Sequence, residues 1–109
     1  MGQYHKLYNL DKKEYVHGHR LNNGLKLMEQ CGWDKSTSTG LWLLLANSSG
    51  RGGGDAREHS LVGRWAGDRI LVQGDYAEPT DKAYLPEPDL ACFTDISDEV
   101  KAMLEAEYA

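Results

Sequence analysis

Long apolar stretches are absent from this chain of 109 residues. The longest hydrophobic run, residues 41–46, is far shorter than the roughly 20 residues that a membrane-crossing helix needs. The first ten residues also lack a basic start followed by an apolar stretch, which argues against a secretory signal. We therefore expect a cytoplasmic protein with no membrane partner.

Cysteine and proline are scarce. Cys31 and Cys92 stand alone without a CxxC pair, so the pattern indicates free thiols, although a disulfide between them stays open. All three prolines fall within residues 77–90, among many acidic residues. This composition is typical of a long surface connection.

Positive charge is nearly missing from the last third of the chain. Residues 72–109 contain two Lys or Arg against ten Asp or Glu, whereas residues 1–71 contain ten against seven, and the net charge is −5. A broad basic face for nucleic acid is therefore not expected. The acidic third would keep the protein soluble, or it would repel or mimic nucleic acid.

The apolar content that is present suffices for one folded domain, because 40% of the residues are hydrophobic and 27% are charged. The order of helix and strand signals predicts a single α+β domain over residues 1–109, with a small antiparallel sheet and two or three helices. The expected elements are a hairpin from strands at 2–10 and 14–17, a helix at 25–31, a hairpin from strands at 60–66 and 69–73, a strand at 90–95 and a helix at 95–108.

Residues 41–46 fit two structures. Their leucines favour a helix capped by Ser36 or Thr37, whereas a short continuous apolar run also suits a buried central strand. We favour the helix, and either structure places this run in the core.

A glycine-rich segment, residues 47–60, follows this run. Neither the P-loop pattern nor the dinucleotide fingerprint occurs in it. Successive glycine N–H groups still favour anion binding, so Gly52, Gly53 and Gly54 together with Arg51 form a candidate phosphate cradle. The alternative is a mobile loop or a tight crossing between core elements.

The neighbouring stretch GRWAGDRI supplies further ligand-binding candidates. Arg64 and Arg69 carry planar groups suited to phosphate, and Trp65 would stack on an aromatic ring. The alternative is a surface hairpin with a half-buried Trp65 and local ion pairs, in which Asp68 is the partner of one arginine or simply a turn residue beside Gly67.

Histidines form a weaker candidate metal site. His17 and His19 are two apart, a spacing that puts both on one face of a strand, and His5, Asp55 and His59 would complete a set of ligands or supply a general base. Gly18 between the first two interrupts a strand, and ordinary surface histidines are the simpler interpretation. We expect no bound cofactor.

Six phrases together resemble a family of small, uncharacterised proteins from bacteriophages and some bacteria: MGQY, NLDKKEY, GLKLMEQ, GRGGGD, GRWAGDRI and GDYA. The resemblance covers residues 1–77 and not the acidic C-terminal third. The family's histidine element is His-Pro-His, where this chain has His17-Gly18-His19. The resemblance implies a phage or mobile-element origin and the cytoplasm of a host bacterium, without an activity.

These observations lead to three hypotheses. The first is a non-catalytic, oligomeric protein that binds an anionic, nucleotide-like ligand and sequesters a host defence signal. The second is an anti-CRISPR-like inhibitor that contacts a host defence protein through its acidic surface. The third is a small metal- or histidine-dependent hydrolase.

Overall fold

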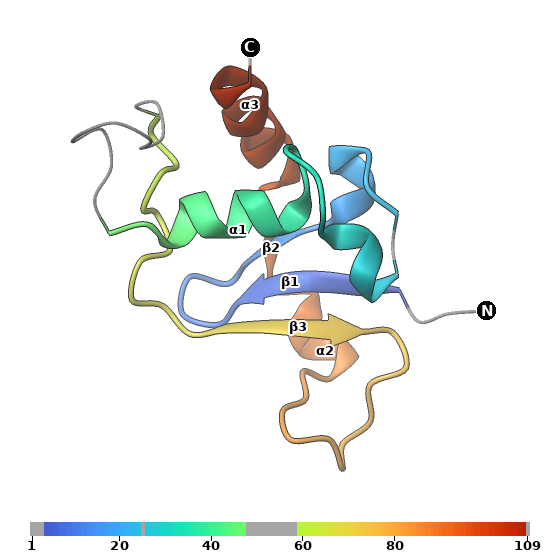
Figure 1. The fold of residues 1–109 in the computed structure, drawn as a ribbon. Helices are drawn as coiled ribbons and strands as arrows, with labels where there is room; N and C mark the ends of the chain where they lie inside the picture. The colour runs from blue at the N-terminus through green and yellow to red at the C-terminus, as the bar shows by residue number, and fades with distance from the viewer. Residues whose placement is uncertain (1–3, 25, 48–58, 109) are drawn as a thin grey trace.

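A four-stranded sheet lies at the centre of the computed structural model, which describes residues 4–24, 26–47 and 59–108 (Figure 1). The strands, in the order β3-β1-β2-β4, are β1 (His5–Asn9), β2 (Glu14–Val16), β3 (Ile70–Gly74) and β4 (Thr94–Asp95). β1 pairs antiparallel with β2 and β3, and β4 joins β2 in parallel. The predicted α+β class and N-terminal hairpin are confirmed, and the two-residue β4 makes the sheet mixed.

Asn9 closes the turn between β1 and β2. Its side-chain oxygen accepts hydrogen bonds from the backbone N–H groups of Asp11 and Lys12, at 2.9 and 2.7 Å. Lys13 then takes a left-handed backbone conformation, with φ of 56°. Asparagine favours such turns because its side chain satisfies nearby backbone donors.

Within the described residues, three α-helices and two short 3₁₀ helices lie around the sheet: η1 (Gly18–Leu21), η2 (Leu27–Gln30), α1 (Thr37–Leu45), α2 (Glu87–Leu90) and α3 (Ser97–Glu107). α1 confirms the helical interpretation of residues 41–46, and it starts after Ser36, whose Oγ accepts from the Thr39 N–H at 3.3 Å. α3 confirms the C-terminal helix. Asp95 precedes it and accepts from the Ser97 N–H at 2.8 Å.

The main core lies between the sheet and the layer formed by α1 and α3 (Figure 1). Leu7 and Val16 from the sheet meet Leu44 and Val100 from the two helices, and each of these side chains is at most 4% exposed. In the described part of the chain, no helix has the length and apolar character needed to cross a membrane.

The predicted hairpin at 60–73 is wrong. Residues 60–67 form turns, and the strand that follows, β3, pairs with β1 instead. The reason is a set of backbone bonds to the end of α1: Gly63 donates to the Leu43 carbonyl at 3.0 Å, and Trp65 to the Leu44 carbonyl at 2.9 Å. These bonds use backbone donors of residues 60–66 that the predicted strand would need.

Three smaller expectations also change. The helix expected at 25–31 is a 3₁₀ helix over Leu27–Gln30, the expected connection at 77–90 contains α2, and the strand expected at 90–95 is reduced to β4. Cys31 and Cys92 are free and exposed, so they do not pair.

Candidate functional site

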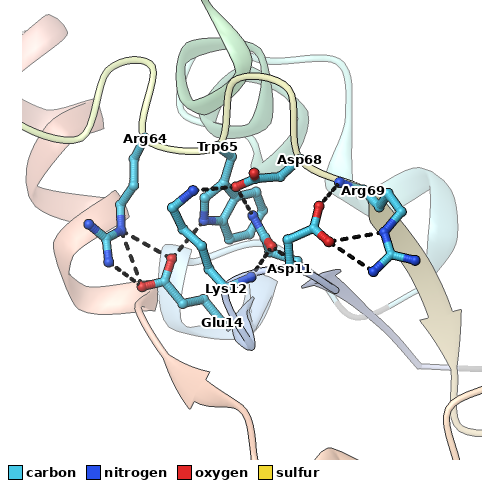
Figure 2. A network of polar contacts seen from close by, with 8 residues as sticks. Asp11, Lys12, Glu14, Arg64, Trp65, Asp68 and Arg69 are labelled. Carbon is cyan, nitrogen blue, oxygen red and sulfur yellow. Dashed lines mark hydrogen bonds and ion pairs between the residues drawn. The ribbon is translucent and has the colours of Figure 1, made fainter.

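Three of the predicted site residues, Arg64, Trp65 and Arg69, belong to a polar network between the β1–β2 turn and the loop before β3 (Figure 2). Trp65 is fully buried, and its Nε1–H donates to Glu14 Oε1 at 2.8 Å. The ring therefore has no open face, and the stacking role expected for it is wrong.

Arg64 also binds Glu14. Its Nη2 lies 2.5 Å from Oε2, and its Nε donates to the same carboxylate at 3.1 Å. Burial opposes ionisation of Glu14, but the hydrogen bonds from Arg64 and Trp65 outweigh this effect and lower the pKa of its carboxyl. The carboxylate thus fixes Arg64 and Trp65 at once.

Arg69 and Asp68 have separate partners. Arg69 forms a bidentate contact with Asp11, with its Nη2 at 2.8 Å and its Nε at 3.0 Å from Oδ1. Asp68 accepts from Lys12 at 2.5 Å and from Asn9 at 2.9 Å, so neither Arg64 nor Arg69 is its side-chain partner.

The charges in this network balance, because each cation forms an ion pair with a carboxylate (Figure 2). The contacts hold the 64–69 loop against the β1–β2 turn, which is a structural role. Arg51, Gly52, Gly53 and Gly54, the other members of the predicted site, lie outside the described residues.

A second group of polar and aromatic side chains lies on the sheet face opposite α1 and α3. It lines a pocket of about 370 Å³, the sheet-face pocket, whose lining residues are Tyr4, Lys6, Tyr8, His17, Gln73, Gly74, Asp75, Glu87 and Leu90. The alternating spacing of Tyr4, Lys6 and Tyr8 puts these three on one face of the chain. That alternation is the sequence signal for this pocket, and on its own it indicates only a strand.

The sheet-face pocket has a rigid aromatic side. Tyr8 packs edge-on against Phe93, with ring centroids 5.5 Å apart, and lies 5.9 Å from the Tyr15 ring. Gln73 is fixed by two hydrogen bonds with the Leu85 backbone, at 2.8 and 2.9 Å. These contacts hold Tyr8 and Gln73 in place before any ligand binds.

His17 faces several positive charges in the same region. Burial lowers the pKa of its imidazole, and nearby Lys6 and His19 lower it further, against an opposing effect of Asp95. The lowered pKa of His17 favours its neutral imidazole at pH 7, and Lys6 supplies positive charge at this side of the pocket. Lys6 Nζ also lies 5.4 Å from the Tyr15 ring centre.

The histidines do not form a metal site within the described residues, where no group of three or more His, Cys, Asp or Glu side chains is suitably placed. The His17 and His19 rings are 6.1 Å apart, and Gly18 begins η1 rather than continuing β2. His5 lines a different pocket, with Leu27 and Leu41. His59 Nδ1 accepts from the Leu61 N–H at 3.2 Å. Asp55, the remaining candidate, is outside the described residues.

No protein-family model, curated protein or solved structure matches this chain.

Proposed function

We propose that this protein is a non-catalytic binding protein for a small, anionic, nucleotide-like ligand, and that the ligand occupies the sheet-face pocket. The observation that carries the proposal is the convergence of Tyr4, Lys6, Tyr8 and His17 on one pocket. A nucleotide has a flat base, which stacks on aromatic side chains, and a phosphate, which binds to a cation and to an imidazole N–H.

Tyr4 would receive the ring of the ligand, because its side chain is 43% exposed and open to solvent. Tyr8 is buried and braced by Phe93, so it forms a fixed wall of the pocket. A base stacked on Tyr4 gains about 1–3 kcal/mol.

Lys6 and His17 would receive the phosphate. The depressed pKa of His17 reflects burial and a local positive potential from Lys6, His19 and Arg20, which an anion would relieve. Asp75 and Glu87, which also line the pocket, are acceptors suited to the amino or hydroxyl groups of a nucleoside.

Thermal unfolding in the presence of cyclic and linear nucleotides tests this proposal. We expect the midpoint to rise with nucleotide concentration, because a ligand that binds the native state stabilises it. Lys6→Met and Tyr4→Ala should each weaken binding about tenfold. Lys82→Met, a change of an exposed lysine outside the pocket, is the matched control. Absence of any stabilisation, or equal binding by Lys6→Met, would contradict the proposal.

Binding should also depend on pH. An anion beside His17 raises the pKa of the imidazole, so ligand binding takes up a proton. The affinity should therefore increase as pH falls through the bound-state pKa of His17 towards its lowered free-state pKa. A phosphodiester such as a cyclic nucleotide is the suitable probe, because it has no phosphate proton to titrate in this range. His17→Gln should flatten the dependence, and a wild-type affinity that is constant with pH would remove His17 from the site.

The resemblance to phage proteins favours sequestration of a host defence signal as the purpose of such binding. A second candidate function, inhibition of a host defence protein, is favoured by a different observation: the acidic side chains of the C-terminal third are largely exposed, among them Glu78, Asp81, Asp89, Glu99 and Glu105.

Competition with DNA for a DNA-binding defence effector tests the second candidate. Changing Glu78, Asp81 and Asp89 to their amides leaves the sheet-face pocket intact. The triple variant should compete less well than the wild type. Equal competition by both proteins would rule out mimicry of nucleic acid by this surface.

A further inference from the structure

β3 is an edge strand, and its hydrogen-bonding pattern defines which groups are free. Leu10 donates to the Arg69 carbonyl at 2.8 Å, and Asp75 donates to the Tyr4 carbonyl at 2.9 Å. In an antiparallel ladder the backbone groups of alternate residues point to opposite sides. Residues 69, 71, 73 and 75 therefore face β1, whereas the N–H and C=O groups of Ile70, Val72 and Gly74 point away from the sheet. Gly74 is buried and its carbonyl accepts from Ala77, so the accessible part of this edge is residues 70–72.

Over residues 70–72, and within the part of the chain that the structure describes, this edge lacks the features that keep edge strands from pairing with other chains. Natural edge strands are protected by lysine, proline, bulges or a covering segment. β3 reads Ile-Leu-Val-Gln-Gly, without a charge or a proline, and Val72 is 48% exposed. Among the described strands, β1 alone pairs with β3. An uncharged edge whose backbone groups have no strand partner among the described residues is a template for another strand.

We propose that β3 pairs antiparallel with β3 of a second copy of this chain, with Val72 on the two-fold axis. In this register Val72 forms a hydrogen-bonded pair with Val72 of the second copy. Ile70 pairs with Gly74, which is buried in the single chain, so the turn from Gly74 to Ala77 has to move aside. The Gly74 carbonyl already accepts from Ala77 at 3.2 Å, and its second lone pair remains for the new bond. Two four-stranded sheets then become one.

The side chains fit this register. Antiparallel pairing about Val72 places Arg69 of each copy, whose guanidinium also binds Asp11, opposite Asp75 of the other copy. Unlike charges therefore meet at both ends of the strand. Arg69 is 74% exposed on its side chain, and Asp75 is exposed. Ile70 faces a glycine, which offers no Cβ to obstruct it. A shift by one register step along the edge loses the match of opposite charges.

The pairing would also affect both neighbouring pockets. On the helix side, Val72 borders an apolar pocket of about 160 Å³ together with Leu27 and Leu41, and the second copy would cover its edge. On the other side, Asp75 lines the sheet-face pocket, so the second copy's Arg69 would reach its rim.

The mass of the full-length protein in solution tests the pairing. Sedimentation equilibrium should give twice the chain mass of 12.2 kDa, with dissociation on dilution. Val72→Lys places a charge on the axis and should weaken the dimer at least tenfold. Tyr108→Lys, at a side chain of similar exposure on α3's C-terminal end, should not. A wild type that stays at 12.2 kDa up to millimolar concentration would overturn the proposal.

A charge-exchange experiment tests the register. Arg69→Glu alone places two carboxylates opposite each other at both ends of the paired strands, and Asp75→Lys alone places two cations there, so each variant should be mainly monomeric. When the two variants are mixed, they should form a heterodimer, because both contacts then join unlike charges. Failure of the mixture to dimerise, with circular dichroism showing both variants folded, would exclude this register. The outcome is independent of ligand binding.

Discussion

Glu14 joins two parts of the chain that are 50 residues apart. It is only 7% exposed, yet its carboxylate accepts from the Trp65 indole and from the Arg64 guanidinium. A buried carboxylate is costly unless strong donors surround it. These two donors offset that cost. In turn, Glu14 accepts from the indole N–H of Trp65, the largest of the fully buried side chains among the described residues.

Removing this carboxylate should destabilise the fold. Glu14→Ala leaves the indole N–H of Trp65 without an acceptor and Arg64 without its partner, and we expect a loss of about 2–4 kcal/mol in the free energy of unfolding. Glu14→Gln keeps an acceptor for the indole and should lose less. Urea denaturation measures both variants, and equal stability of Glu14→Ala and the wild type would contradict the role assigned to this residue.

Stability should fall in acid. The folded-state pKa values of Glu14, Asp11 and Asp68 are all lowered, although burial opposes the shift in each. Hydrogen bonds outweigh burial: from Arg64 and Trp65 to Glu14, from the backbone and side chain of Arg69 to Asp11, and from Lys12 and Asn9 to Asp68. Their contribution is therefore complete above the ordinary values of 4.5 and 3.8 and is lost as pH falls through the lower folded values. Urea denaturation from neutral to acid pH should show this loss. In Glu14→Gln, the free energy of unfolding should depend less steeply on pH.

α1 and α3 cross at a glycine. A Cβ added at Gly40 would lie 2.9 Å from Val100 Cγ1, and Val100 is only 1% exposed. The sequence marks Gly40 only as a poor helix residue. The packing of the two helices explains why this position needs a residue without a side chain.

Gly40→Ala tests this crossing. Helix propensity alone would favour alanine by about 1 kcal/mol, whereas overpacking costs about 1–3 kcal/mol. We expect a net loss of stability, and we expect Val100→Ala to cost less in the Gly40→Ala background than in the wild type. Additive effects in this double-mutant cycle would show that the two residues do not compete for space.

Residues 60–69 show where the prediction of elements failed. Their β-branched and aromatic residues favour a strand locally, but the carbonyls at the end of α1 bind the backbone of Gly63 and Trp65. A hydrogen-bond partner some 20 residues earlier in the chain thus decided their structure. The pairing of β3 with β1 could not be predicted from local sequence either, because it also joins residues far apart in the chain.

The basic and acidic parts of the chain meet in the folded molecule. Arg20, from the positive N-terminal part, pairs with Asp98 on α3 at 2.7 Å and lies 3.7 Å from Asp95. The segregation of charge along the sequence therefore does not produce two separate halves. The ion pair of Arg20 with Asp98 connects η1 to the start of α3, although such exposed pairs stabilise a protein only weakly.

The whole protein should become more stable at higher concentration if two copies pair through β3. Native dimers shift the unfolding equilibrium by mass action, so the thermal midpoint should rise with protein concentration. Val72→Lys should remove this dependence while Tyr108→Lys keeps it. A midpoint that does not change with concentration in the wild type would count against self-association.

Local patterns in the sequence determined the α+β class, the hairpin of β1 and β2, the helical state of residues 41–46 and the C-terminal helix. Each depends on neighbours within a few positions, where propensity and capping act. The tertiary structure decided the burial of Trp65, the partners of Arg64 and Arg69, and the pocket around Lys6 and His17. These rest on contacts between residues dozens of positions apart, such as Trp65 with Glu14, which no local pattern encodes.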